Sequence, residues 1–118
     1  MKYMLIHTLD PSAEHSTDGM PTFDSWLDEM LARGVTLHGD RLRDVSDATT
    51  VQVRDREVLV SDGPFAETKE QIAGYDVIEC ADLDEAIEIA AKHPTAWMGT
   101  IEVRPILSVQ CGIPEEGG

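Results

Sequence analysis

Residues 74–94 read GYDVIECADLDEAIEIAAKHP, and they join a strand to a helix. The first eight residues predict a strand, whose side chains point alternately to the two faces of a sheet. Asp82 with Glu85 predicts the start of a helix, and Pro94 predicts its end. The apolar side chains of that helix recur at helical spacing and predict its buried stripe: Leu83, Ala86, Ile87, Ala90 and Ala91.

Similar patterns before and after this stretch predict the remaining strands and helices. Strands are predicted at 2–8, 35–39 and 100–106, and a helix is predicted from Thr22, as its cap, to Gly34. Residues 49–54 and 57–61 predict an inserted β-hairpin. Without that hairpin the order is βαββαβ, so we expect an α+β, ferredoxin-like fold. One domain over residues 1–108 and a tail at 109–118 are predicted.

Both helices of such a fold cover one face of the sheet. The alternation predicts a helix-facing set: Met4, Ile6, Val35, Leu37, Ile78, Cys80, Ile101 and Val103. It leaves a mixed set on the open face: Tyr3, Leu5, His7, Thr36, His38, Tyr75, Val77, Glu79, Thr100, Glu102 and Arg104. A mixed face of this kind suits an interface that encloses a semi-polar pocket, so we expect a homodimer.

The composition of the chain disfavours two classes of binding partner, nucleic acids and membranes. The 118 residues carry a formal net charge of −14, which disfavours direct binding to nucleic-acid phosphates. No apolar run is long enough to cross a bilayer, so we expect a cytoplasmic protein without a membrane partner. Cys80 and Cys111 lack CxxC spacing, and we expect Cys80 to fill the core.

Four segments together carry a resemblance to a known family: MKYMLI at the start, VLVSDGPFAETKEQIAGYDVIE in the centre, then DLDEAIEIAAKHP and IEVRPI. The chain resembles the YCII-related superfamily, specifically its DGPF-domain branch. This resemblance implies a ferredoxin-like protomer in a dimeric α/β barrel, with a cleft for a small molecule. It leaves the reaction open.

Some YCII-related proteins use a His–Asp pair whose histidine lies on the first helix. The predicted first helix here, residues 23–33, contains no histidine, so neither His7 nor His15 takes that role by position. DGPF segments also resemble those associated with extracytoplasmic-function sigma factors. The resemblance therefore implies a regulatory alternative to an enzyme.

The SDGPF corner, residues 61–65, combines residues that favour tight turns. Asp62 has two interpretations. It either accepts backbone hydrogen bonds in an Asx-turn, or it acts as an acid or base at the end of a strand beside a rigid bend. His7, whose side chain has the intrinsic pKa for proton transfer, is the second candidate catalytic residue.

Four further side chains are candidate ligand-binding residues: Arg41, Lys69, Tyr75 and Arg104. The three cations can meet an anionic group of a ligand, although surface ion pairing is the simpler interpretation of each. His15 and His93 are expected to be solvated. The four histidines show no metal-ligand spacing, and no glycine-rich nucleotide motif is present, so we predict neither a metal nor a cofactor.

Two functions follow from these patterns. The first is a small-molecule-binding dimer in which Asp62 and His7 transfer protons. The second is a non-catalytic regulatory or interaction module. An enzyme places ionisable groups within hydrogen-bond reach in a concave pocket, whereas a module shows an exposed apolar patch.

Overall fold

The computed structural model describes residues 1–14, 16–65 and 70–107. His15, Lys69, Cys111 and the predicted tail lie outside the described residues. The elements follow one another as β1 (Lys2–Leu9), α1 (Phe23–Arg33), β2 (Thr36–Arg41), the 3-10 turn η1 (Val45–Asp47), β3 (Thr49–Arg54), β4 (Glu57–Asp62), β5 (Gln71–Glu79), α2 (Leu83–Ala91), α3 (Pro94–Met98) and β6 (Thr100–Pro105).

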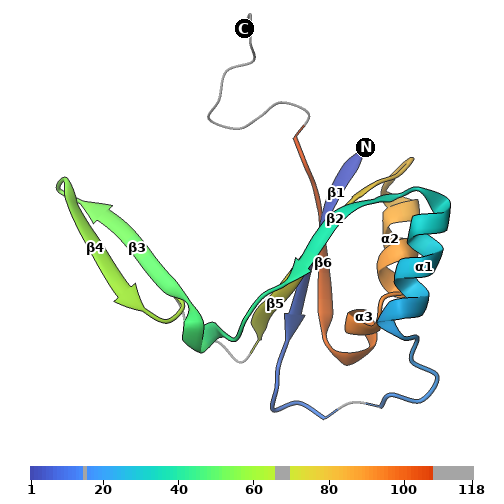
Figure 1. The fold of residues 1–118 in the computed structure, drawn as a ribbon, viewed down its shortest axis with the longest axis horizontal. Helices are drawn as coiled ribbons and strands as arrows, with labels where there is room; N and C mark the ends of the chain where they lie inside the picture. The colour runs from blue at the N-terminus through green and yellow to red at the C-terminus, as the bar shows by residue number, and fades with distance from the viewer. Residues whose placement is uncertain (15, 66–69, 108–118) are drawn as a thin grey trace, which may run out of the picture.

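Four strands form one antiparallel sheet in the order β2-β5-β1-β6, and α1, α2 and α3 lie together on one side of it (Figure 1). This arrangement is α+β and is consistent with the predicted ferredoxin-like fold. β3 and β4 pair only with each other, and the hairpin extends away from the helix-covered sheet (Figure 1).

The ends of the two long helices follow local chemistry. Thr22 caps α1 by accepting a hydrogen bond from the Ser25 N–H at 3.1 Å, and Gly34 ends the helix at a φ of 70°. Asp82 caps α2 by accepting from the Glu85 N–H at 2.9 Å. The Glu85 carboxylate in turn accepts from the Ala81 N–H at 2.7 Å, so both predicted capping residues act.

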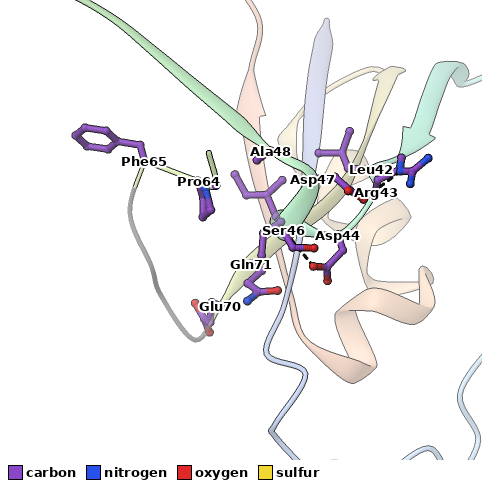
Figure 2. A pocket seen from close by; sticks show the side chains of 13 residues that line it. Leu42, Arg43, Asp44, Ser46, Asp47, Ala48, Pro64, Phe65, Glu70 and Gln71 are labelled. Carbon is purple, nitrogen blue, oxygen red and sulfur yellow. Dashed lines mark hydrogen bonds and ion pairs between the residues drawn. The ribbon is translucent and has the colours of Figure 1, made fainter. Parts of the chain in front are cut away.

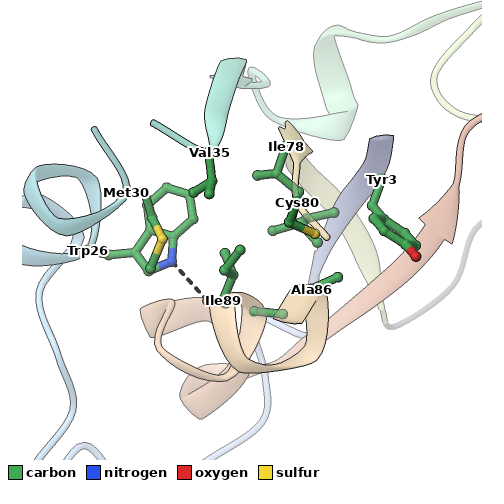
Figure 3. Packing of buried hydrophobic residues seen from close by; sticks show 10 residues of the cluster. Tyr3, Trp26, Met30, Val35, Ile78, Cys80, Ala86 and Ile89 are labelled. Carbon is green, nitrogen blue, oxygen red and sulfur yellow. Dashed lines mark hydrogen bonds between the residues drawn. The ribbon is translucent and has the colours of Figure 1, made fainter. Parts of the chain in front are cut away.

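The core lies between the sheet and the helices (Figure 3). Trp26 and Met30 of α1 pack with Ile89 of α2, and the Trp26 indole donates a hydrogen bond to the Ile89 carbonyl at 3.0 Å. The predicted stripe of α2 was partly wrong, because Leu83 and Ile87 are 48% and 51% exposed and Ala91 is exposed too. Ile89 takes the buried position because Ala86, Ile89 and Ala90 form the face turned toward the sheet.

The predicted faces of β1 are reversed. Tyr3, Leu5 and His7 are buried beneath the helices, whereas Met4 and Ile6 lie on the other side and are half-buried. Alternation alone did not separate the two sets because each contains large apolar side chains. The correction matters for function, since it moves His7 from the open face of the sheet to the helix side.

Pro94 was predicted to end a helix, but in the structure it also begins another one. The proline is the first residue of the short helix α3. His93 caps α3, and this histidine is buried at 6% exposure rather than solvated as predicted. The turn thus carries His93 back toward the sheet.

The β3–β4 hairpin presents an apolar face. Val51 lies opposite Val60, and Val53 lies opposite Val58, so these four side chains share one face of the ribbon. They are 55–64% exposed. We call this set the valine face.

No described helix is both long enough and apolar enough to cross a bilayer.

Candidate functional site

Three ionisable side chains meet on the helix side of the sheet. His7 comes from β1, Asp76 comes from β5, and His93 comes from the turn before α3. The His7 Nε2 lies 2.7 Å from the Asp76 Oδ2, and the His93 Nε2 lies 3.9 Å from the same oxygen. The two imidazole rings are 4.3 Å apart between centroids. We call these three residues the His–Asp–His cluster.

Strand register brings His7 and Asp76 together. β1 pairs with β5 so that Leu5 is opposite Asp76 and His7 is opposite Gly74. Asp76 is therefore the diagonal neighbour of His7, close enough for their side chains to meet across the strands. Gly39 of β2 lies opposite Asp76, and its missing side chain leaves room for the carboxylate.

The hydrogen bond assigns the His7 proton. An ionised Asp76 can only accept, so the His7 Nε2 must carry the hydrogen that it shares. The Nδ1 of His7 is then an acceptor, and it is buried without a hydrogen-bond partner among the described residues. The alternative, a buried and unpaired N–H at Nδ1, is the less favourable arrangement.

His93 is held by the backbone of its own turn. Its Nδ1 accepts a hydrogen bond from the Thr95 N–H at 3.0 Å, so the neutral ring carries its proton on Nε2. The pKa of His93 is lowered to about 4, chiefly by burial and then by the nearby His7, while Asp76 opposes the shift. Near neutral pH, His93 is an uncharged N–H donor that faces the carboxylate.

The cluster also has the residue types of a metal site, and its ligand atoms lie within 4.8 Å of one another. The protonation of His93 argues against this use. Its Nδ1 lone pair is already engaged by the Thr95 N–H, so a metal at Nε2 would require either an imidazolate or loss of the cap. The geometry fits proton transfer better than cation binding.

A cleft of about 490 Å³ opens onto the cluster. Phe23, Leu9 and Met98 supply apolar lining, and Phe23 also contacts the edge of the His93 ring at 5.8 Å between centroids. Arg41 at the end of β2 lines the same cleft and has no ion pair among the described residues. Such a cleft can hold a partly apolar molecule with an anionic group.

The predicted site residues fall in different places. His7, Arg41 and Tyr75 line this one cleft, so the structure brings three of them together. Asp62 does not join them, because it ends β4 in the separate hairpin sheet. Arg104 lies on β6, is paired with Glu102 at 3.3 Å, and lines neither this cleft nor the one beside the hairpin.

Three residues of the SDGPF corner, Gly63, Pro64 and Phe65, line a second cleft, which lies between the base of the hairpin and the start of β5 (Figure 2). Gly63 shapes this corner: its φ is 89°, and its N–H donates to the Ala48 carbonyl at 2.7 Å. The Asp62 carboxylate has no hydrogen bond within the described part of the chain, so the expected Asx-turn is not seen there. Phe65 is 78% exposed at the rim.

Sequence reasoning missed Asp76 and His93. A signal for Asp76 was present, because it shares its strand parity with Ile78 and Cys80, which were predicted to face the helices. A carboxylate on a buried face needs a partner, and His7 provides one. No local signal marked His93, whose burial depends on the path of the chain through α3.

Comparison with known proteins adds a family but no activity. A family model described as the YCII-related domain matches residues 1–110. A protein described as uncharacterized, from Rhizobium meliloti (strain 1021), is 46% identical over 68 residues, which cover 56% of this chain. The match spans 55% of that relative, so the chain aligns with about half of its length.

Proposed function

The chain belongs to the YCII-related family, and from that premise we propose that it is a homodimeric enzyme that binds a small organic molecule and transfers protons at His7 and Asp76. The observation that carries this proposal is the 2.7 Å hydrogen bond between the His7 Nε2 and the Asp76 Oδ2 at the wall of a cleft. Ionisable groups within hydrogen-bond reach in a concave site are the signature of acid/base chemistry.

The two residues have different tasks in this proposal. Asp76 is the proton acceptor, because its carboxylate lines the cleft and keeps lone pairs that His7 does not use. His7 donates its Nε2–H to the carboxylate and holds it in place. The side chains of His7 and Asp76 are only 7% and 13% exposed, so water competes little for the hydrogen bond that orients the carboxylate.

Arg41 points to an anionic group on the ligand. It is the one Lys or Arg among the described residues that line this cleft, in a chain whose net charge is −14. Its guanidinium can bind a carboxylate or phosphate through two parallel hydrogen bonds. Tyr75 lines the same cleft, whereas Asp62 and Arg104 do not line it and have no part in this version of the site.

The valine face supports the homodimer. An isolated two-stranded hairpin is at best marginally stable in water, and this one exposes four valines on one side. A second copy of the chain that covers the valine face would bury this patch. Such a two-fold interface is the commonest form of self-association among soluble proteins.

The same patch favours a second candidate, a non-catalytic module that binds another protein through the valine face. The two candidates differ at the His–Asp–His cluster. A module has no need of a hydrogen-bonded His–Asp pair beside a cleft, whereas an enzyme depends on it. The enzyme is therefore our first choice.

A screen of pooled polar metabolites by ligand-observed NMR tests the proposal. We expect one or more anionic compounds to bind the wild-type protein and to lose affinity in Arg41→Ala, with Arg104→Ala as the matched control. Asp76→Asn should keep binding and abolish conversion of the bound compound. Conversion at the wild-type rate by Asp76→Asn would overturn the assignment of the base.

A further inference from the structure

We propose that His93 is a second catalytic residue, a neutral hydrogen-bond donor that polarises a carbonyl group of the bound molecule while Asp76 removes a proton from the adjacent carbon. This inference rests on the proposed function and adds a substrate class to it. The substrate is then a carbonyl compound with an exchangeable C–H bond next to the carbonyl carbon.

His93 has one N–H to offer, and the direction of that N–H is fixed. The Thr95 N–H occupies the Nδ1 lone pair, so the proton stays on Nε2. Nε2 lies 3.9 Å from the Asp76 Oδ2, which is longer than a hydrogen bond. No described residue accepts from Nε2 at hydrogen-bond distance, so this donor is left for a ligand.

His93 also stays neutral. Trp26 packs edge-on against its ring at 4.7 Å between centroids, and Phe23 contacts it at 5.8 Å, so its surroundings disfavour a charge. The ionisable groups that face it are His7 and Asp76. Its lowered pKa, about 4, agrees with this environment. A neutral donor can stabilise an enolate oxygen without first neutralising the nearby base.

The donor, His93, and the base, Asp76, lie side by side on one cleft. A carbonyl oxygen and the adjacent carbon belong to one small group, so a donor and a base that serve both must be close neighbours. The Nε2 of His93 and the carboxylate of Asp76 meet this condition. His7, whose ring neighbours that of His93, donates to the same carboxylate oxygen and orients the base.

The chemical step needs no other reactant. The C–H proton moves to the Asp76 carboxylate, and the C–H electron pair forms a C=C bond to the carbonyl carbon. The carbonyl π pair moves to oxygen, where the His93 Nε2–H stabilises the charge. Return of the proton to the same or to a neighbouring carbon gives exchange or isomerisation, with no net oxidation or reduction.

Deuterium exchange tests the inference with two defined probes, 2-oxobutanoate and cyclohexanone. The protein is incubated with each probe in D2O, and proton NMR follows the loss of the signals beside the carbonyl. We expect the wild type to accelerate exchange of 2-oxobutanoate, and we expect Asp76→Asn to lower the rate by about 10²–10⁴-fold. Cyclohexanone, which lacks the anionic group, should exchange more slowly.

Two variants of His93 separate catalysis from folding. His93→Asn keeps an acceptor for the Thr95 N–H but removes the donor at Nε2, so it should fold and lose about 10²–10³-fold in exchange rate. His93→Gln restores an N–H near the Nε2 position and should recover part of the rate. Circular dichroism melts check that each variant is folded.

The possible outcomes are distinct. Loss of exchange in both Asp76→Asn and folded His93→Asn supports the inference. Loss in Asp76→Asn alone overturns the role of His93 and leaves the His7–Asp76 base intact. Absence of exchange with both probes in the wild type overturns the carbonyl substrate class, while the metabolite screen still tests the base independently.

Discussion

At the residue scale, the position of the Asp76 carboxylate depends on Gly39. A Cβ added at Gly39 would lie 2.7 Å from the Tyr75 carbonyl oxygen and 2.8 Å from the Asp76 Cγ, closer than real Cβ atoms approach. The backbone carbonyl cannot move without disturbing the β2–β5 pairing. A glycine is therefore needed at position 39 because the site leaves no room for a side chain, and not because a turn requires an unusual backbone conformation.

We therefore predict that Gly39→Ala destabilises the fold by about 1–3 kcal/mol and displaces the Asp76 carboxylate. Urea denaturation measures the first effect, and loss of conversion of the screened ligand measures the second. His38→Ala at the exposed neighbouring position is the control and should change neither. A Gly39→Ala protein with unchanged stability would contradict the close approach.

A second glycine holds the SDGPF corner. Gly63 has a φ of 89°, which disfavours any side chain, whereas Asp62 makes no hydrogen bond within the described residues. We predict that Gly63→Ala lowers the stability by about 1 kcal/mol or more and that Asp62→Asn changes it little. Equal melting temperatures for Gly63→Ala and the wild type would contradict this assignment.

At the element scale, the turn from α2 into α3 links stability to pH through His93. The folded protein lowers the pKa of His93 to about 4, while the unfolded chain keeps an ordinary value near 6.5. Between these two values the unfolded chain binds more protons, so the His93 contribution to stability falls as the pH falls through this window. Above and below this window, the His93 contribution to stability does not change with pH.

We predict that the melting temperature of the wild type falls between pH 6.5 and pH 4 more steeply than that of His93→Asn. Differential scanning calorimetry at several pH values measures both slopes. His38→Asn removes an exposed histidine and should keep the wild-type slope. Identical slopes for the wild type and His93→Asn would show that His93 titrates normally in the fold.

The elements also show what the sequence could predict. Strong local signals, such as the caps at Thr22 and Asp82, predicted helix starts that the structure confirms. The faces of β1 were assigned wrongly, because both faces of this strand carry large apolar side chains. The His–Asp–His cluster joins positions 7, 76 and 93, and its formation depends on register and on the course of α3, which local patterns do not encode.

At the scale of the whole molecule, the hairpin is the element that the described chain leaves most exposed (Figure 1). We predict a dimer in solution, and we predict that Val58→Lys weakens it by placing a charge on the valine face. Ser61→Lys adds the same charge to the opposite face and is the control. Light scattering of the wild type at micromolar concentration gives the mass, and a value near 13.0 kDa would contradict the dimer.

The charge distribution of the whole molecule fits the proposed ligand. The chain is strongly acidic, and several of its described cations are in ion pairs: Arg33 binds Glu29, Glu85 and Glu88, and Lys92 binds Glu29 and Glu88 between α1 and α2. Arg41 stands apart from these pairs at the cleft. An unpaired guanidinium beside the base is a reasonable place for the anionic end of a substrate.

Nitrogen-15 NMR of the histidine side chains at neutral pH shows directly whether His7 and Asp76 form one proton-sharing pair. We predict a His7 ring with its proton on Nε2 in the wild type and a changed ring signal in Asp76→Asn, while the exposed His38 signal stays the same. A His7 ring protonated on Nδ1, or one whose signal is identical in Asp76→Asn, would contradict it.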